Sequence, residues 1–168
     1  MYDITLIGAA ILDVLARPVS KEGLSGRSCP ADSITLTPGG DACNEAITLA
    51  RLGKRVNLIT KLGNDLSGQL LLHYFRENGV STEDTVIEPN LDTGINMVLV
   101  DPKAERSFIT NRNGSLRKLG PADIPREALG GLLFCALPAS SCLPALTFRL
   151  WPPCFALPRS RAVFSVQI

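Results

Sequence analysis

Two adjacent glycines, a carboxylate and an amide near the start of the chain have the types and spacing of a site for a polyhydroxylated ligand. Gly39-Gly40 comes directly before a stretch with helical periodicity. Glycines at this place let the backbone approach a ligand beside the free N–H groups of a helix N-terminus. Asn44 falls at about the first turn of that stretch, and Asp13 follows a short apolar segment. A carboxylate and an amide that converge on adjacent hydroxyl groups are suited to binding a sugar.

Each of these residues also has a plain structural interpretation. A Gly-Gly pair before a helix is often only a loop, and aspartate such as Asp13 is common in turns. Asp41, between the glycines and the helical stretch, is better explained as a helix N-cap than as a ligand. Spacing alone leaves these alternatives open.

The elements that would position these residues alternate between strands and helices. Apolar runs at 4–8 and 55–60 predict buried strands, and apolar residues three and four apart predict amphipathic helices at 42–52 and 66–77. Asp13 would then lie on a loop at the carboxyl end of the first strand, where open α/β sheets bind ligands. The order predicts an α/β protein with a parallel sheet and flanking helices.

Finer predictions concern the two helices and a β appendage. Cys43 is expected in the core, Asp65 as a helix cap, and His73 at the surface. The second helix is expected to turn four side chains inward: Leu70, Leu71, Tyr74 and Phe75. Residues 34–37 alternate like an exposed strand, and residues 96–110 predict a hairpin turning around Pro102-Lys103.

The whole constellation resembles the first signature of the ribokinase (PfkB) family of carbohydrate kinases, over residues 1 to about 128. The matching motifs are Gly39-Gly40-x-x-x-Asn44-x-Ala46-x-x-x-Ala50-x-Leu52-Gly53, then Gly63-x-Asp65-x-x-Gly68 and Gly79-Val80. Gly8 followed by Asp13 is similar to the opening strand and substrate-binding aspartate of that family. Thr93-Gly94 and Glu105-Arg106, on either side of the hairpin, are similar to its lid strands.

The resemblance implies a ribokinase-like fold with a small β lid. It implies that Asp13, Gly39, Gly40 and Asn44 hold the hydroxyl groups of a sugar. It also implies that Arg106 contacts the substrate from the lid, although a solvated strand charge explains Arg106 equally well. Lids of this family can pair between subunits, so a homodimer through the lid is a second expectation.

The sequence departs from the family in its second half. The family carries a D-T-x-G-A-G-D pattern there, whose aspartate is the catalytic base and whose glycines stabilise the transferring phosphoryl group. That pattern does not occur in this sequence. We therefore expect no catalytic residue, no metal ligand and no ATP site on this chain alone, although the full-length family uses ATP and Mg²⁺. The sequence predicts an incomplete N-terminal fragment of a carbohydrate kinase; the alternative is a non-catalytic binding or dimerisation module.

Composition divides the chain near residue 131. Residues 131–168 contain three Arg, no Lys and no acidic residue, together with three of the five Cys and five of the twelve Pro. We interpret 1–130 as the kinase part and 131–168 as a divergent tail, either from a shifted reading frame or mis-splicing, or a genuine variant. The run Leu132-Leu-Phe-Cys-Ala-Leu137 is nevertheless compatible with one more buried strand.

Charge and targeting patterns exclude several classes. A net charge of +1 gives no electrostatic surface for nucleic acid. The uncharged stretch 128–148 contains Pro138 and Pro144, which would break a membrane helix, so a membrane span is not favoured. Asp3 and Asp13 argue against a secretory signal, and the odd number of Cys argues against a disulfide framework. The expected location is the cytoplasm.

Overall fold

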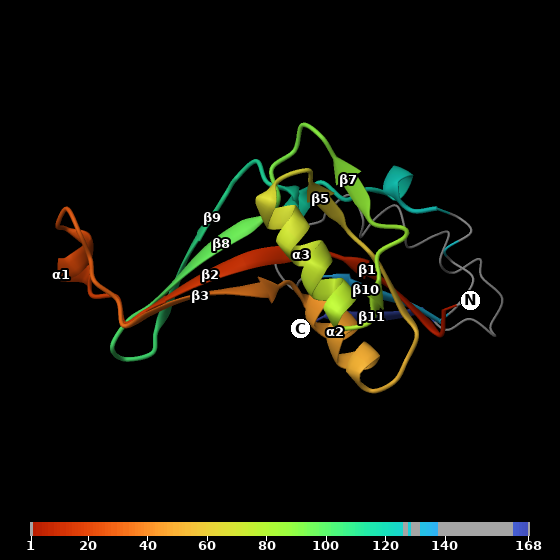
Figure 1. Cartoon of the computed structure of the whole chain (residues 1–168), viewed down its shortest axis with the longest axis horizontal. Helices are drawn as coiled ribbons and strands as arrows, with labels where there is room; N and C mark the ends of the chain where they lie inside the picture. The colour runs from red at the N-terminus through yellow and green to blue at the C-terminus, as the bar shows by residue number, and fades with distance from the viewer. Residues whose placement is uncertain (1, 126–127, 129–131, 138–162, 168) are drawn as a thin grey trace.

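The computed structural model describes residues 2–125, 128, 132–137 and 163–167 (Figure 1). In this part of the chain the strands form a five-stranded central sheet of order β11-β10-β1-β4-β6 and a four-stranded lid sheet of order β3-β2-β8-β9. Short strands β5 (Lys61–Gly63) and β7 (Val86–Glu88) pair separately. The lid sheet extends away from the body, with the short helix α1 (Lys21–Leu24) at its far end.

The central sheet is parallel, as the alternation of strands and helices predicted. Strand β1 pairs with β4 and with β10, in register Ile4↔Val56 and Ile4↔Leu132. The central strands have the following bounds: β1 (Ile4–Gly8), β4 (Val56–Ile59), β6 (Val80–Ser81), β10 (Leu132–Leu137) and β11 (Val163–Gln167). Strands β1 and β4 are buried along their whole length, as expected for strands that are covered on both faces.

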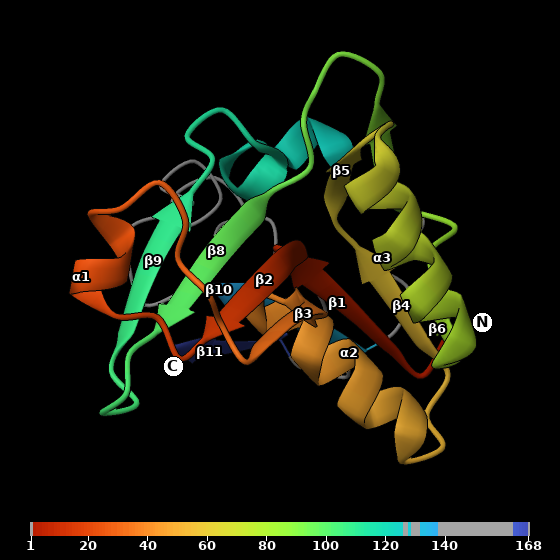
Figure 2. The same cartoon turned by 60° about the vertical axis from the view of Figure 1, so that its left-hand side comes forward.

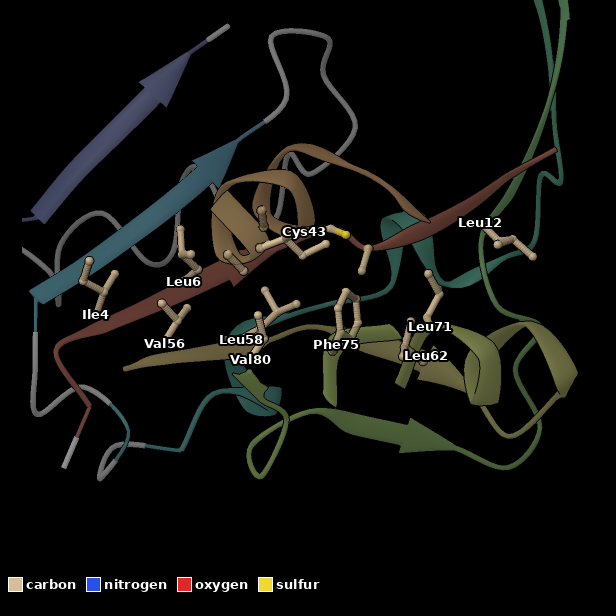
Figure 3. Close-up of a cluster of buried hydrophobic side chains, with 14 residues drawn as sticks. Ile4, Leu6, Leu12, Cys43, Val56, Leu58, Leu62, Leu71, Phe75 and Val80 are labelled. Carbon is tan, nitrogen blue, oxygen red and sulfur yellow. The ribbon is translucent and has the colours of Figure 1, made fainter. Parts of the chain in front are cut away.

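Helices α2 (Asp41–Arg51) and α3 (Leu66–Glu77) pack beside β1 and β4 (Figure 2). The core between them contains Leu6 and Leu58 from the sheet, Cys43 from α2 and Phe75 from α3, all fully buried (Figure 3). Cys43 is thus a core residue, as predicted.

Two details of the helices differ from the sequence predictions. Gly40, with φ of 95°, is the N-cap of α2, and Asp41 lies inside the first turn, so the prediction of Asp41 as N-cap was wrong. In that position its negative charge still interacts favourably with the positive end of the helix dipole. Leu70 is 40% exposed because Leu71 and Phe75, four residues apart, form the stripe that faces the core. Asp65 caps α3 as predicted, accepting a hydrogen bond from the Gly68 N–H at 2.7 Å.

The lid sheet is larger than the predicted hairpin. The hairpin itself is confirmed as β8 (Ile95–Val100) and β9 (Arg106–Thr110), paired antiparallel. It is extended by β3 (Ser33–Gly39) and by β2 (Ile11–Arg17), which begins almost directly after β1. Asp13 therefore lies within a strand and not on a loop, which corrects the prediction.

The strand predicted at 132–137 is confirmed as β10, in the central sheet next to β1. Residues 138–162 lie outside the described residues, and with them most of the predicted tail, so the division at 130/131 stays a prediction. Among the helices that the structure describes, none has the length and apolarity to cross a membrane.

Candidate functional site

Four polar residues lie side by side across the lid sheet, one on each strand. Asp13 on β2 pairs with Thr37 on β3 and with Asn96 on β8, and Asn96 pairs in turn with Thr110 on β9. The Thr110 hydroxyl donates a hydrogen bond to Asn96 Oδ1, which shows that these two side chains share a face. We call these four residues the polar row. It places one carboxylate, one amide and two hydroxyls on one face of the lid sheet.

Asp13 is the unusual member of the polar row. Its Oδ1 is buried and has no hydrogen-bond partner among the described residues. Burial raises the pKa of the Asp13 carboxyl above its ordinary value, and a side-chain interaction with Asn96 lowers it by less. A buried carboxylate oxygen without a donor costs free energy that the folded chain does not recover by itself.

Gly39 and Gly40 bring the start of α2 against this carboxylate. A Cβ atom on Gly39 would lie 2.6 Å from Asp13 Cγ, so only glycine leaves room for the Asp13 side chain. Gly40 adopts a φ of 95°, which glycine tolerates, and a Cβ there would lie 3.3 Å from Ala10 Cα. The Cys43 thiol confirms that the carboxylate is near. Burial raises its pKa to about 12, and the charge of Asp13 adds to that effect.

The other two predicted residues, Asn44 and Arg106, lie outside the polar row. Asn44 is exposed in the first turn of α2, where its N–H bonds the Gly40 carbonyl at 3.0 Å. Its side chain has no hydrogen-bond partner within the described residues. Arg106 pairs with Val100. Strand alternation places it on the face of the polar row, four residues from Thr110 and thus about 13 Å along β9.

The sequence interpretation found Asp13 and missed the rest of the polar row. Thr37, Asn96 and Thr110 are ordinary strand residues in isolation, and only the pairing of four strands places them in line. The alternation along β8 could have indicated which residues share a face with Asn96. It could not have indicated that Asp13, on another strand, lies on the same face of the sheet.

The Gly63-x-Asp65-x-x-Gly68 motif has a structural role beneath this site. Asp65 accepts hydrogen bonds from the Thr93 N–H at 2.8 Å and from the Thr93 hydroxyl at 2.7 Å. Burial raises the pKa of Asp65, but the hydrogen bonds from Thr93 and Gly68 outweigh burial and leave the pKa below its ordinary value. Through these hydrogen bonds Asp65 connects the start of α3 to the segment that precedes β8.

Comparison with known proteins decides the family. The profile described as pfkB family carbohydrate kinase matches residues 1–135. This chain belongs to the PfkB family. A ribokinase from Dictyostelium discoideum is 29% identical over 142 residues, which cover 82% of this chain and 44% of the ribokinase.

Solved structures of PfkB proteins share the fold. A fructokinase from Xylella fastidiosa superposes with a TM-score of 0.67 at 28% identity, over 82% of this chain and 42% of the fructokinase. A PfkB protein from Polaromonas sp. JS666 gives a TM-score of 0.77 at 22% identity, over 98% of this chain and 55% of that protein. The PfkB chain described here therefore spans about half the length of its relatives.

The Xylella fructokinase has also been solved with bound ATP, so members of the PfkB family bind this nucleotide. Within the polar row, the Asp13 carboxylate would repel phosphate oxygens placed directly against it. The part of the chain that the structure describes does not bring together three or more residues of the types that hold a metal ion. The donors and acceptors of the polar row suit the hydroxyl groups of a polyhydroxylated ligand.

Proposed function

We propose that this chain binds a sugar on the polar row, as the sugar-binding part of an ATP-dependent carbohydrate kinase, and that it transfers no phosphoryl group by itself. Within the proposal, Asp13 and Asn96 accept and donate hydrogen bonds to adjacent hydroxyl groups. Gly39 and Gly40 admit the sugar ring to the N-terminus of α2, and Asn44 reaches it from the first helical turn. A cytoplasmic location is part of the proposal.

The buried Oδ1 of Asp13 is the observation that carries this proposal. An acceptor without a donor is satisfied when a ligand supplies one, and the hydroxyl groups of a sugar are donors. The neighbouring acceptors and donors of the polar row allow two hydroxyl groups to be bound at once. The absence of D-T-x-G-A-G-D from the sequence supports the second half of the proposal.

Isothermal titration of the full chain with ribose, fructose and deoxyribose, each with and without ATP and Mg²⁺, tests both halves. We expect at least one sugar to bind and Asp13→Asn to weaken that binding by about 10-fold or more, since hydrogen bonds to a charged group are strong. The matched control is Asp32→Asn. Asp32 is exposed next to β3, and its side chain forms no hydrogen bond or ion pair within the described residues.

Each half has its own contradicting result. Equal affinities for the wild type and Asp13→Asn would place the sugar elsewhere. Production of ADP that depends on the sugar, measured by a coupled assay, would show that this chain carries phosphoryl-transfer residues after all.

A second candidate function, pairing with another copy through the lid, has its own observation. The row next to the polar row is apolar and lies on the opposite face of the lid sheet: Leu36, Val14, Met97 and Ile109 pair across the four strands. Three of these are largely exposed, Leu36 at 60%, Met97 at 45% and Ile109 at 56%. Two copies that face each other would bury the same row on each side, the geometry of a two-fold dimer.

The mass of the chain in solution tests this second function. We expect light scattering after size exclusion to give a dimer, and Leu36→Lys to give a monomer. Thr35→Lys is the matched control, because Thr35 is also exposed but points to the other face of β3. A wild-type monomer, or equal dissociation by both variants, would contradict the pairing.

For the tail we propose that residues 131–168 arise partly from a shifted reading frame or from mis-splicing. The compositional break at residue 131 supports this. Sequencing the coding DNA tests it: an alternative frame past this point should encode further strands and helices of the kinase fold, and its absence would leave a genuine variant tail.

A further inference from the structure

A small hollow lies at the end of β9, where the polar row ends. Its volume is about 180 Å³. Six residues line it: Thr110, Asn111, Arg112, Gly114, Leu116 and Arg117. None of the residues that line it is acidic, and the side chains of its two arginines form no ion pair or hydrogen bond within the described part of the chain. It therefore offers two uncompensated positive charges to whatever enters it.

The loop that carries these arginines is held in place by hydrogen bonds on both sides. The Asn111 amide accepts from the Ile95 N–H at 2.8 Å and donates to the Thr93 carbonyl at 2.9 Å. Further along, the Ser115 hydroxyl accepts from the Gly94 N–H at 2.9 Å. A Cβ on Gly114 would lie 2.5 Å from the Asn111 amide, so glycine is needed for this packing. The loop that lines the hollow is therefore bonded to Thr93 and Gly94, the segment before β8 that Asp65 also holds.

Thr110 belongs both to the hollow and to the polar row. Asp13 and Thr110 are separated by β8 alone, and neighbouring strands lie about 4.8 Å apart, so the hollow begins about 10 Å from Asp13. A six-carbon sugar chain with an ionised group at one end spans a comparable length. One ligand can therefore place a hydroxyl on Asp13 and its charged end against Arg112 and Arg117.

We propose that the substrate of this site is an anionic sugar, a sugar acid or a sugar phosphate, whose charged group is bound by Arg112 and Arg117. The inference rests on the proposed function, because the polar row must bind the sugar part. Guanidinium groups suit this task, since their planar donors match carboxylate and phosphate oxygens in pairs. Asp13 would repel a charged group at its own end of the row, which fixes the orientation of the ligand.

Matched neutral and anionic ligands test the proposal on the full chain. Glucose, gluconate and glucose 6-phosphate differ mainly in the charged group, and titration calorimetry compares their affinities. We expect gluconate or glucose 6-phosphate to bind about 10-fold or more tightly than glucose, with the advantage decreasing as salt is added. The variant Arg112→Gln/Arg117→Gln should remove the advantage and leave glucose binding unchanged. Arg76→Gln, an exposed arginine of α3, is the matched control.

Inorganic phosphate and acetate, titrated alone and followed by the amide NMR signals of Gly114 and Leu116, test the hollow without a sugar. We expect both signals to shift in the wild type and in Asp13→Asn, but not in the double arginine variant. The anion that shifts them at the lower concentration distinguishes a phosphate site from a carboxylate site.

The outcomes separate this inference from the proposed function. Equal binding of glucose and both anionic ligands, or an advantage that survives loss of both arginines, overturns the anionic substrate and leaves sugar binding intact. An anionic ligand that binds equally well to Asp13→Asn overturns the polar row as the sugar site. Absence of binding by every sugar and by both anions overturns both.

Discussion

Replacing Asp13 by Asn should make the folded chain more stable while it weakens ligand binding. In the ligand-free protein, the Asp13 Oδ1 is buried and has no partner within the described residues. Burial raises the pKa of this carboxyl, which means that the fold opposes its ionisation. Asn has nearly the same shape and leaves a polar group in place, but it carries no charge, so the substitution removes the cost of ionisation without creating a cavity.

The size of the gain follows from the environment of the carboxylate. An unsatisfied buried polar group costs about 1–3 kcal/mol, and a charged one costs more; the substitution removes only this difference, and because Asp13 is partly buried we take it as small. We expect a gain of roughly 1 kcal/mol at pH 7, which corresponds to a rise in Tm of about 2–4 °C for a chain of this size.

The gain must depend on pH in a defined direction. The folded pKa of Asp13 lies above the unfolded value of about 3.9. Below the unfolded pKa, Asp13 is protonated in both states and the wild type pays no ionisation penalty. As pH rises through the folded pKa, the penalty becomes complete, so the advantage of Asp13→Asn should grow from pH 3 to pH 7.

Urea unfolding of both proteins at several pH values measures this difference directly, with Asp32→Asn as the control that should change little. Refutation would come from an Asp13→Asn protein that is less stable at pH 7, or from a gain that is the same at pH 3. Either result would mean that Asp13 is satisfied in the free protein, and the argument for a ligand at this carboxylate would lose its basis.

Three further predictions concern the neighbourhood of the site. Gly39→Ala should displace the Asp13 carboxylate, because its Cβ would lie 2.6 Å from Asp13 Cγ; titration should show sugar affinity falling, and an unchanged affinity would contradict the packing. Asp65→Ala should lower the free energy of unfolding by about 2–4 kcal/mol, as a helix cap and the partner of buried Thr93 are lost together; in a double-mutant cycle with Thr93→Val, additive effects would argue against this link. Cys43 is buried and its thiol has a pKa of about 12, so it should resist alkylation in the native protein while the partly exposed Cys29 reacts. Peptide mapping by mass spectrometry measures the labelling of each cysteine. Equal labelling would mean that α2 opens.

The sequence predicted the body of the fold better than the lid. Local patterns sufficed for β1 and for α3, whose predicted and observed bounds are both 66–77, because apolar runs and helical spacing are properties of neighbouring residues. The prediction that Asp13 lies on a loop was wrong. Strand β2 follows β1 so closely that the sequence pattern indicates one strand followed by a loop. Its strand character depends on pairing with β3 and β8, which no local pattern reveals.

The candidate site is thus a product of strand register, and the residues that hold the register matter as much as those that face the ligand. A slip of one residue between β8 and β9 would remove Thr110 from its place opposite Asn96 and bring a residue of the other face, such as Ile109, into the row. Two sets of hydrogen bonds oppose such a slip. Asp101 accepts from the Lys103 and Glu105 N–H groups and fixes the turn of the hairpin, and Asn111 fixes its open end through Ile95 and Thr93. Neither residue belongs to the polar row, yet both help to keep Thr110 opposite Asn96. Loss of Asn111 should therefore disturb both the polar row and the arginine-lined hollow, because one amide sets the position of both.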